Sequence, residues 1–393
     1  MHTARRTHSF TESVIRGMTR LASEHDAINL AQGFPNFPAP EVLKEAAARA
    51  IRDDLNQYAI TWGAKRLRDA LARKYADWYG MKVNPETEIT VTCGATEAMA
   101  SALLAIVDPG DEVIVFEPFY ENYGPDAILS GAKPVYVPLA ADAELDLDRL
   151  AAAFSRRTRA IIVCTPNNPT GRVLSRRELD AIAELCRRHD AYAVTDEIYE
   201  HIYYEGEHIP IATLEGMRER TVTISGASKT FSVTGWRVGT IVAPPDATDA
   251  IRKVHDFLTV GAPAPLQEAI AVALETLGED YYEGLARDYR ARRDLLCRAL
   301  VDSGFRCTPP QGAYYVLADC SAITQQPDDE FSVWLTKEIG VAPVPGSSFF
   351  GRPEAGRHLV RFAFCKTEEL LREAARRLAR LKAPARPPRP ARA

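Results

Sequence analysis

The sequence lacks the features that mark membrane proteins, disulfide-linked secreted proteins and nucleic-acid-binding proteins. No apolar run approaches the length of a membrane span, and no long apolar stretch of the export-signal kind follows Arg5-Arg6. The net charge of −5 over 393 residues leaves no basic footprint for nucleic acid or an anionic membrane. The seven cysteines are odd in number and include no Cys-x-x-Cys pair, which favours reduced core thiols over disulfides or zinc. We therefore expect a soluble cytoplasmic protein.

Two nucleotide-binding fingerprints are also missing, Gly-x-Gly-x-x-Gly and Gly-x-x-x-x-Gly-Lys-Ser/Thr. A phosphate bound by this chain need not then belong to a nucleotide. Apolar material is abundant, because 46% of the residues are hydrophobic and can build a sizeable core. The length favours one large domain and one smaller domain.

Short apolar runs alternate with longer amphipathic runs between about Glu88 and Ala243. This alternation predicts an α/β fold with a mostly parallel seven-stranded sheet flanked by helices, joined to a smaller α+β domain. Ligands of such sheets bind at the carboxyl ends of the strands, so we expect the chemistry in the loops there. The predicted strands are Glu88–Thr92, Glu112–Phe116, Pro134–Val137, Ala160–Cys164, Ala191–Thr195, Thr221–Ser225 and Gly239–Ala243, and predicted helices include Thr96–Val107, Tyr120–Gly131 and Ser175–His189.

The character of the sequence changes after Pro263, where a long charged helix is predicted from about Asp280 to Ser303. We expect an N-terminal segment, 1–32, that packs on the small domain, a large domain over 33–280 and a small domain over 281–383. Residues 384–393 are rich in proline and arginine, cannot continue a helix and are expected to be a flexible tail.

Lys229 is the most informative residue, in the run Ser225-Gly226-Ala227-Ser228-Lys229 at the end of a predicted strand. A lysine among small residues at a strand end can approach a bound aldehyde and form a Schiff base. Arg237, eight residues further on, is placed to meet a phosphate of the same ligand. Most Ser-x-x-Lys segments are solvated loops, so this interpretation depends on three other segments.

The first supporting segment is Cys93-Gly94-Ala95-Thr96, where a strand runs into small residues and then a helix. The N–H groups at the start of that helix suit a phosphate, although an ordinary turn capped by Thr96 has the same pattern. The second is the turn Asn167–Gly171, whose asparagine amides suit a ring hydroxyl, and whose alternative is a simple tight turn.

The third segment is Thr195-Asp196-Glu197-Ile198-Tyr199, in which a carboxylate emerges from a buried strand. Such a carboxylate needs a partner, and a protonated pyridine nitrogen is a good one. Metal binding is the rival interpretation. No histidine or second carboxylate cluster accompanies Asp196 except Glu197, which should point to the opposite face, so we expect no metal.

Together these segments resemble the class I, fold-type I aminotransferases that use pyridoxal 5'-phosphate, over nearly the whole chain. Within that family the chain is most similar to the kynurenine, glutamine and methionine aminotransferase branch, through Leu30 to Pro40 and Phe116 to Tyr123. The motifs that carry the resemblance are Asn29–Pro35, Asn56–Tyr58, Gly110–Val113, Glu117–Tyr120, the turn Asn167–Gly171, Thr195–Tyr199, Ser228–Thr230, Thr234–Arg237 and Val360–Phe362.

The resemblance implies that Lys229 forms the Schiff base and then acts as base and acid in the proton shift. It implies that Asp196 keeps the pyridine nitrogen protonated, so that the ring acts as an electron sink. Asn168 and Tyr199 are implied to hydrogen-bond the ring oxygen beside the imine, and Tyr120 to stack on the ring.

The phosphate is implied to contact Arg237 and the N–H groups of Ala95 and Thr96. Many relatives also have a serine three residues before the lysine, where this chain has Gly226 between Ser225 and Ser228. Either hydroxyl can take that place, and we name Ser225 as the candidate. Tyr58 is implied to reach the phosphate of the other subunit, which makes the active site that of a homodimer.

The substrate α-carboxylate is implied to bind Arg361, with Gly33 and Asn168 close by. Tyr58, Trp62, Tyr120 and Phe349-Phe350 could line an apolar pocket, which favours aromatic, thioether or glutamine-type substrates over aspartate. A pyridoxal-phosphate C–S β-lyase shares these residues and is the alternative function, whereas a non-catalytic binding protein is disfavoured by Lys229. His189 and His255 are expected on helix surfaces.

Overall fold

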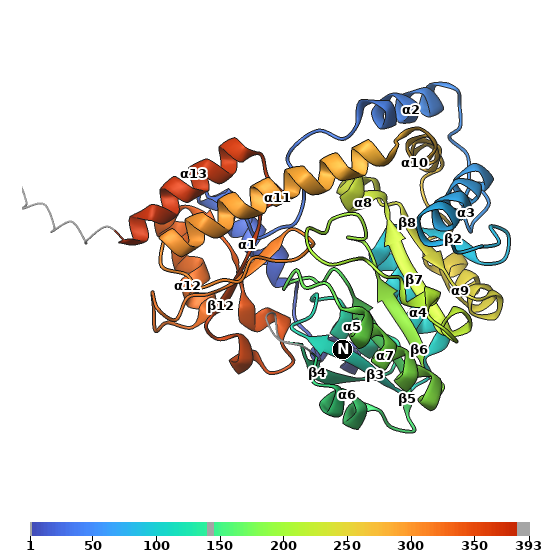
Figure 1. Cartoon of the computed structure of the whole chain (residues 1–393), viewed down its shortest axis with the longest axis horizontal. Coiled ribbons are helices and arrows are strands. Elements are labelled where there is room, and N and C mark those ends of the chain that lie inside the picture. The colour runs from blue at the N-terminus through green and yellow to red at the C-terminus, as the bar shows by residue number, and fades with distance from the viewer. Residues whose placement is uncertain (1, 140–144, 383–393) are drawn as a thin grey trace, which may run out of the picture. The chain divides into compact units, whose positions relative to one another are not determined.

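The computed structural model describes residues 2–139 and 145–382, and these fall into two compact units (Figure 1). The large unit contains residues up to Thr11, Phe34–Tyr289 and Pro310–Ala313, and the small unit contains Glu12–Gly33, Arg290–Pro309 and the chain from Tyr314 onward. The division falls inside the long helix α11 (Glu279–Asp302), between Tyr289 and Arg290. The predicted tail lies outside the described residues.

The large unit is built on a seven-stranded sheet in the order β2-β8-β7-β6-β5-β3-β4. Neighbouring strands are parallel except at β8, which runs antiparallel to both β2 and β7, so the sheet is mostly parallel as predicted. The strands are β2 (Ile89–Thr92), β3 (Glu112–Glu117), β4 (Lys133–Pro138), β5 (Thr158–Cys164), β6 (Tyr192–Asp196), β7 (Thr221–Gly226) and β8 (Gly239–Val242).

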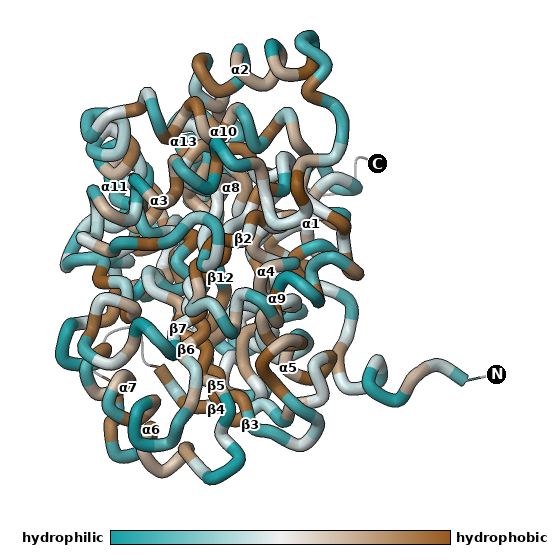
Figure 2. Tube along the Cα trace, turned by 90° about the vertical axis from the view of Figure 1, so that its right-hand side faces the viewer, coloured by the Kyte–Doolittle hydropathy of each residue, from teal (hydrophilic) through white to brown (hydrophobic). Residues whose placement is uncertain are grey.

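Both faces of this sheet are covered, because alternate residues of each strand enter different hydrophobic clusters. Val113 and Val115 of β3 pack with α4 and α9, whereas Ile114 and Phe116 pack with α6 and α7. The apolar strands β5, β6 and β7 appear brown in Figure 2. The helices of these two layers are α4 (Ala95–Ile106), α5 (Tyr123–Leu129), α6 (Leu147–Ala153), α7 (Arg176–His189) and α9 (Pro245–Leu258).

A third hydrophobic cluster joins β2 and β8 to the remaining helices of the large unit. Leu67 and Leu71 of one helix and Ile270 of another pack there with Val91 and Val242 of the sheet. The side chains of Val91 and Val242 at this end of the sheet are thereby removed from solvent. These helices are α2 (Glu41–Arg52), α3 (Lys65–Tyr79) and α10 (Ala264–Thr276), and the short α8 (Ala227–Thr230) follows β7.

The small unit contains two small sheets. The N-terminal strand β1 (Ile28–Asn29) pairs in parallel with β10 (Val341–Ala342). An antiparallel sheet in the order β11-β12-β9 joins β11 (Val344–Pro345), β12 (Leu359–Ala363) and β9 (Tyr315–Asp319). The helices α1 (Val14–Glu24), α12 (Asp328–Trp334) and α13 (Glu368–Leu378) belong to this unit.

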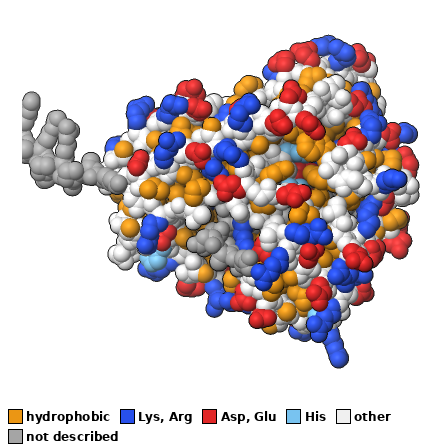
Figure 3. Space-filling view, in the orientation of Figure 1, with side chains coloured by type: hydrophobic (Ala, Val, Ile, Leu, Met, Phe, Trp, Pro, Cys, Tyr) orange, Lys and Arg blue, Asp and Glu red, His pale blue; other side chains and the backbone are white. Residues whose placement is uncertain are grey.

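The surface carries charges of both signs. Acidic and basic side chains are interspersed over the face shown in Figure 3, in keeping with a net charge of only −5. No helix in the described part of the chain is both long enough and apolar enough to cross a membrane.

Candidate functional site

A cradle for an anion lies in the large unit, where β2 turns into α4. Gly94 precedes the helix with φ 84°, and a Cβ atom there would lie 2.3 Å from Nη2 of Arg237. Gly239 approaches the same turn so closely that its Cβ would lie 2.6 Å from the Ala95 nitrogen. The positive φ of Gly94 and the backbone contact at Gly239 favour glycine at both positions, and the absence of a side chain at position 94 leaves room for the Arg237 guanidinium beside the first turn of α4.

The start of α4 is open to an anion, because no side chain among the described residues caps it. Thr96 is thus not the cap that the alternative interpretation required. Glu97, in the first turn, folds back: its Oε2 accepts from the Cys93 N–H at 3.0 Å, and its Oε1 accepts from the Ser101 hydroxyl. The backbone N–H groups of Ala95 and Thr96 and the guanidinium therefore form a site that fits a phosphate dianion.

Asp196 ends β6 at full depth in the sheet and is held by two donors. The Tyr123 hydroxyl donates to Oδ2 at 2.7 Å, and the Ile198 N–H donates to Oδ1 at 3.2 Å. Burial raises the pKa of Asp196, although these donors and the nearby charge of Lys229 oppose the rise. A buried carboxylate of this kind gains most from a cationic partner, which a protonated pyridine nitrogen supplies.

Glu197 points away from Asp196, as predicted from strand alternation. Its carboxylate accepts from the Thr195 hydroxyl at 2.8 Å and lies 3.1 Å from Nε2 of His208. Among the described residues, no group of three or more histidine, cysteine or acidic side chains is arranged to hold a metal ion.

Lys229 lies in α8, one turn after β7 ends. Gly226 begins this turn, and a Cβ atom there would come within 2.8 Å of the Val238 carbonyl oxygen on β8. The backbone of β8 thus occupies the space beside position 226. The lysine follows β7 at the edge of the sheet where Asp196 ends β6, because Asp196 pairs with Ile224 near the end of β7.

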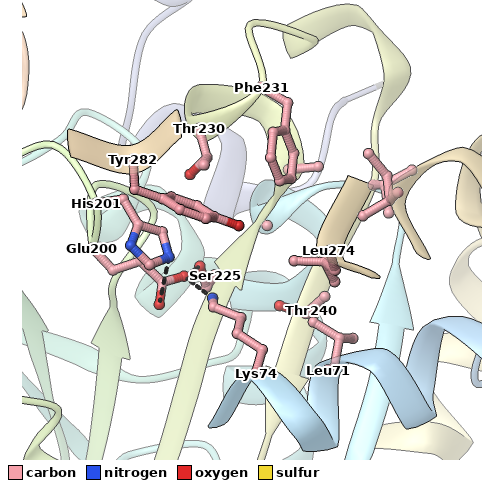
Figure 4. A pocket seen from close by; sticks show the side chains of 14 residues that line it. Leu71, Lys74, Glu200, His201, Ser225, Thr230, Phe231, Thr240, Leu274 and Tyr282 are labelled. Carbon is pink, nitrogen blue, oxygen red and sulfur yellow. Dashed lines mark hydrogen bonds and ion pairs between the residues drawn. The ribbon is translucent and has the colours of Figure 1, made fainter. Parts of the chain in front are cut away.

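The predicted phosphate contact of Ser225 is wrong in this structure. Its hydroxyl donates to Glu200, which also forms a buried ion pair with Lys74 at 2.5 Å (Figure 4). Burial raises the pKa of Glu200, but Lys74 and the neighbouring histidines lower it by more, so this carboxylate stays ionised. Ser225 therefore belongs to a separate charged cluster, which lies beside a small cavity of about 20 Å³.

Three further predicted residues follow the strands of the same sheet. Asn168 is buried in the turn after β5, where the side chain of its neighbour Asn167 closes the turn by accepting from the Thr170 hydroxyl at 2.8 Å. Tyr199 is buried in the turn after β6. Tyr120 packs edge-on against Tyr123, with ring centroids 5.7 Å apart, and so lies near Asp196.

The small unit contains a candidate carboxylate site around Arg361 on β12. Arg361 is fully buried, donates from Nη2 to the Ala31 carbonyl oxygen at 2.7 Å, and lies over the rings of Tyr315 at 4.2 Å and Phe349 at 4.8 Å. The rings fix the plane of the guanidinium. Gly33 lies in the same unit, where the Tyr314 hydroxyl donates to its carbonyl oxygen at 2.9 Å.

Two residues of this arrangement were missed from the sequence. Tyr123 supplies the side-chain hydrogen bond to Asp196, and its only sequence signal is its position three residues after Tyr120. Gly94 permits the approach of Arg237, and a lone glycine before a helix gives no such indication in a single sequence.

Comparisons with known proteins identify the family. The sequence matches the family described as aminotransferase class I and II over residues 25–378. The chain therefore belongs to this family and is a pyridoxal-phosphate-dependent aminotransferase. The anion cradle at the start of α4, the hydrogen-bonded carboxylate of Asp196 and the amine of Lys229 fit that cofactor.

Three relatives are similar over almost the whole chain. A probable N-succinyldiaminopimelate aminotransferase DapC of Mycobacterium tuberculosis is 41% identical over 96% of this chain and 98% of its own, and the solved structure of this M. tuberculosis enzyme covers 97% of the chain with a TM-score of 0.94. The methionine aminotransferase of Escherichia coli is 40% identical, covering 94% and 96%. Human kynurenine–oxoglutarate transaminase 1 is 37% identical, covering 90% and 92%.

Proposed function

We propose that this chain moves the amino group of an L-amino acid with an aromatic, thioether or glutamine-type side chain to a 2-oxo acid by a ping-pong mechanism. The observation that supports the proposal most is that β2, β6 and β7 end, and β8 begins, at one edge of the sheet, next to the α4 cradle, Arg237, Asp196 and Lys229. The seven cysteines carry no disulfide, which supports a cytoplasmic location.

Each residue of the site has a chemical task. When bound, pyridoxal phosphate supplies an aldehyde that binds amines and a ring that accepts an electron pair from the substrate carbon. The Lys229 amine would take the proton from the substrate α-carbon and give it to the carbon that was the cofactor's aldehyde, and with the 2-oxo acid it would move a proton in the opposite direction. Asp196 holds the proton on the pyridine nitrogen, and Asn168 and Tyr199 donate hydrogen bonds to the ring oxygen.

The side-chain preference is supported by apolar surroundings of the carboxylate site. Phe349 and Tyr315 flank Arg361 within the small unit, so aromatic rings form the immediate surroundings of the proposed carboxylate site. The similarity to a methionine and a kynurenine aminotransferase points in the same direction. Trp62 is less available for a pocket than expected, because its ring covers Arg252 at 4.9 Å.

A scan of amino donors and oxo-acid acceptors with the purified enzyme tests this function. We expect methionine, phenylalanine, kynurenine or glutamine to be better donors than aspartate. Arg361→Lys keeps the charge but loses the planar fork, so it should lower kcat/KM for every donor by about 2 to 4 kcal/mol of transition-state binding. The matched control Arg376→Lys, on the exposed face of α13, should behave like the parent.

Two outcomes of the scan would contradict the proposal. Aspartate as the best donor would overturn the apolar pocket. Pyruvate, ammonia and thiol formed in place of a 2-oxo acid and an aminated cofactor would indicate the C–S β-lyase, which the aminotransferase relatives do not favour.

We propose a homodimer because apolar side chains are exposed on two adjacent segments of the large unit. Tyr58 is 87% exposed and Phe257 is 95% exposed, with Ile60 and Val260 about half exposed. The segments touch each other, since the Thr61 carbonyl oxygen accepts from the ring of His255 on α9 at 2.8 Å. A second copy of the chain would cover this surface and place Tyr58 at the partner's phosphate.

Mixing two inactive variants tests the shared site. Lys229→Ala and Tyr58→Ala dimers should each have little activity. Subunit exchange should restore roughly a quarter of the parent activity, because half of random dimers are hybrids and each hybrid has one intact site. Light scattering gives the oligomeric state, and a fully active monomer or the absence of restoration after proven exchange would contradict the shared site.

A further inference from the structure

His255 on α9 is fully buried, whereas its sequence pattern predicts a helix surface. Both ring nitrogens have partners: Nε2 lies 2.8 Å from the Thr61 carbonyl oxygen, and Nδ1 lies 3.1 Å from Oε1 of Glu97 and 3.3 Å from the Thr259 hydroxyl. A carbonyl oxygen can only accept, so Nε2 carries a proton and donates it to Thr61. The charge of the ring then depends on the proton between Nδ1 and Glu97.

The surroundings of Glu97 place that proton on the histidine. The Cys93 N–H donates to one carboxylate oxygen and the Ser101 hydroxyl donates to the other, and such donors stabilise the charged carboxylate. A glutamic acid also loses its proton more readily than an imidazolium does. His255 is therefore an imidazolium that donates two hydrogen bonds in opposite directions.

These hydrogen bonds join two parts of the proposed active site. Glu97 belongs to the first turn of α4, whose N–H groups form the phosphate cradle, and Cys93 lies in the turn just before this helix. Thr61 belongs to the segment that carries Tyr58, which we propose to complete the partner's site. A second contact joins the turn before α4 to the chain just after α9: the Cys93 thiol donates to the carbonyl oxygen of Gly261 at 3.4 Å.

We propose that protonated His255 is a positioning residue that fastens the phosphate-binding turn of α4 to the segment around Thr61. The inference rests on the proposed function. His255 touches neither cofactor nor substrate in this proposal. It keeps the N–H groups of Ala95 and Thr96 in place, so its loss should weaken cofactor retention more than it slows turnover of enzyme saturated with cofactor.

The charge makes this contact sensitive to pH. Burial lowers the pKa of His255, but the bonds to Glu97 and Thr61 and the charge of Asp256 raise it by more, so the pKa lies above its ordinary value. Arg252 on the same helix is turned to the carbonyl oxygens of Glu86 and Ile89. A raised pKa means that the contact is complete at low pH and is lost as pH rises through that pKa.

The test measures cofactor release from holoenzyme, followed by loss of the visible band after dilution into inorganic phosphate. His255→Gln should release cofactor roughly 10- to 100-fold faster than the parent near pH 7, as expected for loss of a hydrogen bond to a charged group. Its kcat at saturating cofactor should change by about threefold or less. Release from the parent should accelerate as pH rises and approach the rate of the variant.

Matched variants separate this role from general damage. Glu97→Gln should release cofactor as fast as His255→Gln, and the double variant should be no faster than either. His189→Gln, at the end of α7, should match the parent. A pH-independent release rate in the parent, which needs no variant, would overturn the proposal, as would a His255→Gln enzyme that retains cofactor normally.

Failure of this role and failure of the proposed function are distinguishable. A protein that binds no pyridoxal phosphate, with no visible band that borohydride fixes on Lys229, would refute the function itself. A normal band with unchanged release in His255→Gln would refute only the positioning role.

Discussion

Replacing Lys229 with alanine should reduce transamination by on the order of 10⁴-fold or more, because the variant lacks both the amine that binds the aldehyde and the base that moves the α-proton. The cofactor should still bind without a covalent bond. The α4 cradle, Arg237 and Asp196 are built by the sheet and its glycines, not by the lysine. Single-turnover kinetics and the visible spectrum measure the two effects separately.

Borohydride treatment gives the sharpest readout of this variant. In the parent it should bleach the visible band and leave a cofactor adduct on the peptide that contains Lys229. In Lys229→Ala the cofactor should be removable by dialysis. The control Lys44→Ala removes an exposed lysine of α2 that pairs with Glu41 and should behave like the parent. Substantial transamination by Lys229→Ala would contradict the assignment of Lys229 as the residue that binds the aldehyde and moves the α-proton.

The strands of the large unit were predictable because their residues are apolar and bounded by turn residues. All seven observed strands lie within two residues of the predicted bounds. The antiparallel direction of β8 was not predictable, since the direction of a strand depends on the path of the chain and not on its composition. The helix predicted over Tyr120–Gly131 begins only at Tyr123, because the residues after β3 form a turn first.

Site residues that lie at the end of a strand, such as Asp196 and Lys229, could be predicted from the sequence. The face on which a side chain lies was harder to predict. In β7 the first five residues are all buried, so burial does not distinguish the two faces, and Ser225 was assigned to the wrong neighbours. The burial of His255 was missed for a related reason. The sequence does not show that this polar residue of α9 is paired with Glu97, and an unpaired histidine in a helix is expected at the surface.

Asp196→Asn should leave the apoprotein at least as stable at neutral pH as the parent. Burial raises the pKa of Asp196 in the folded chain, so the unfolded chain loses this proton first as pH rises. Ionisation of Asp196 therefore costs stability in the apoprotein above the unfolded pKa, and asparagine removes that cost while keeping nearly the same volume. Thermal unfolding of parent and variant apoproteins near pH 4 and pH 7 measures this difference.

The same substitution should depress kcat strongly in the holoenzyme. Asparagine can still accept from Ile198 or Tyr123, but it carries no charge to hold the proton on the pyridine nitrogen. Losing one partner of a buried charged pair costs about 3 to 5 kcal/mol, which corresponds to roughly a 10²- to 10⁴-fold loss of rate. The opposite directions of the two effects make the test specific, because a residue that served only the fold would lower stability and activity together. Equal kcat in Asp196→Asn and the parent would show that the carboxylate does not face the ring nitrogen.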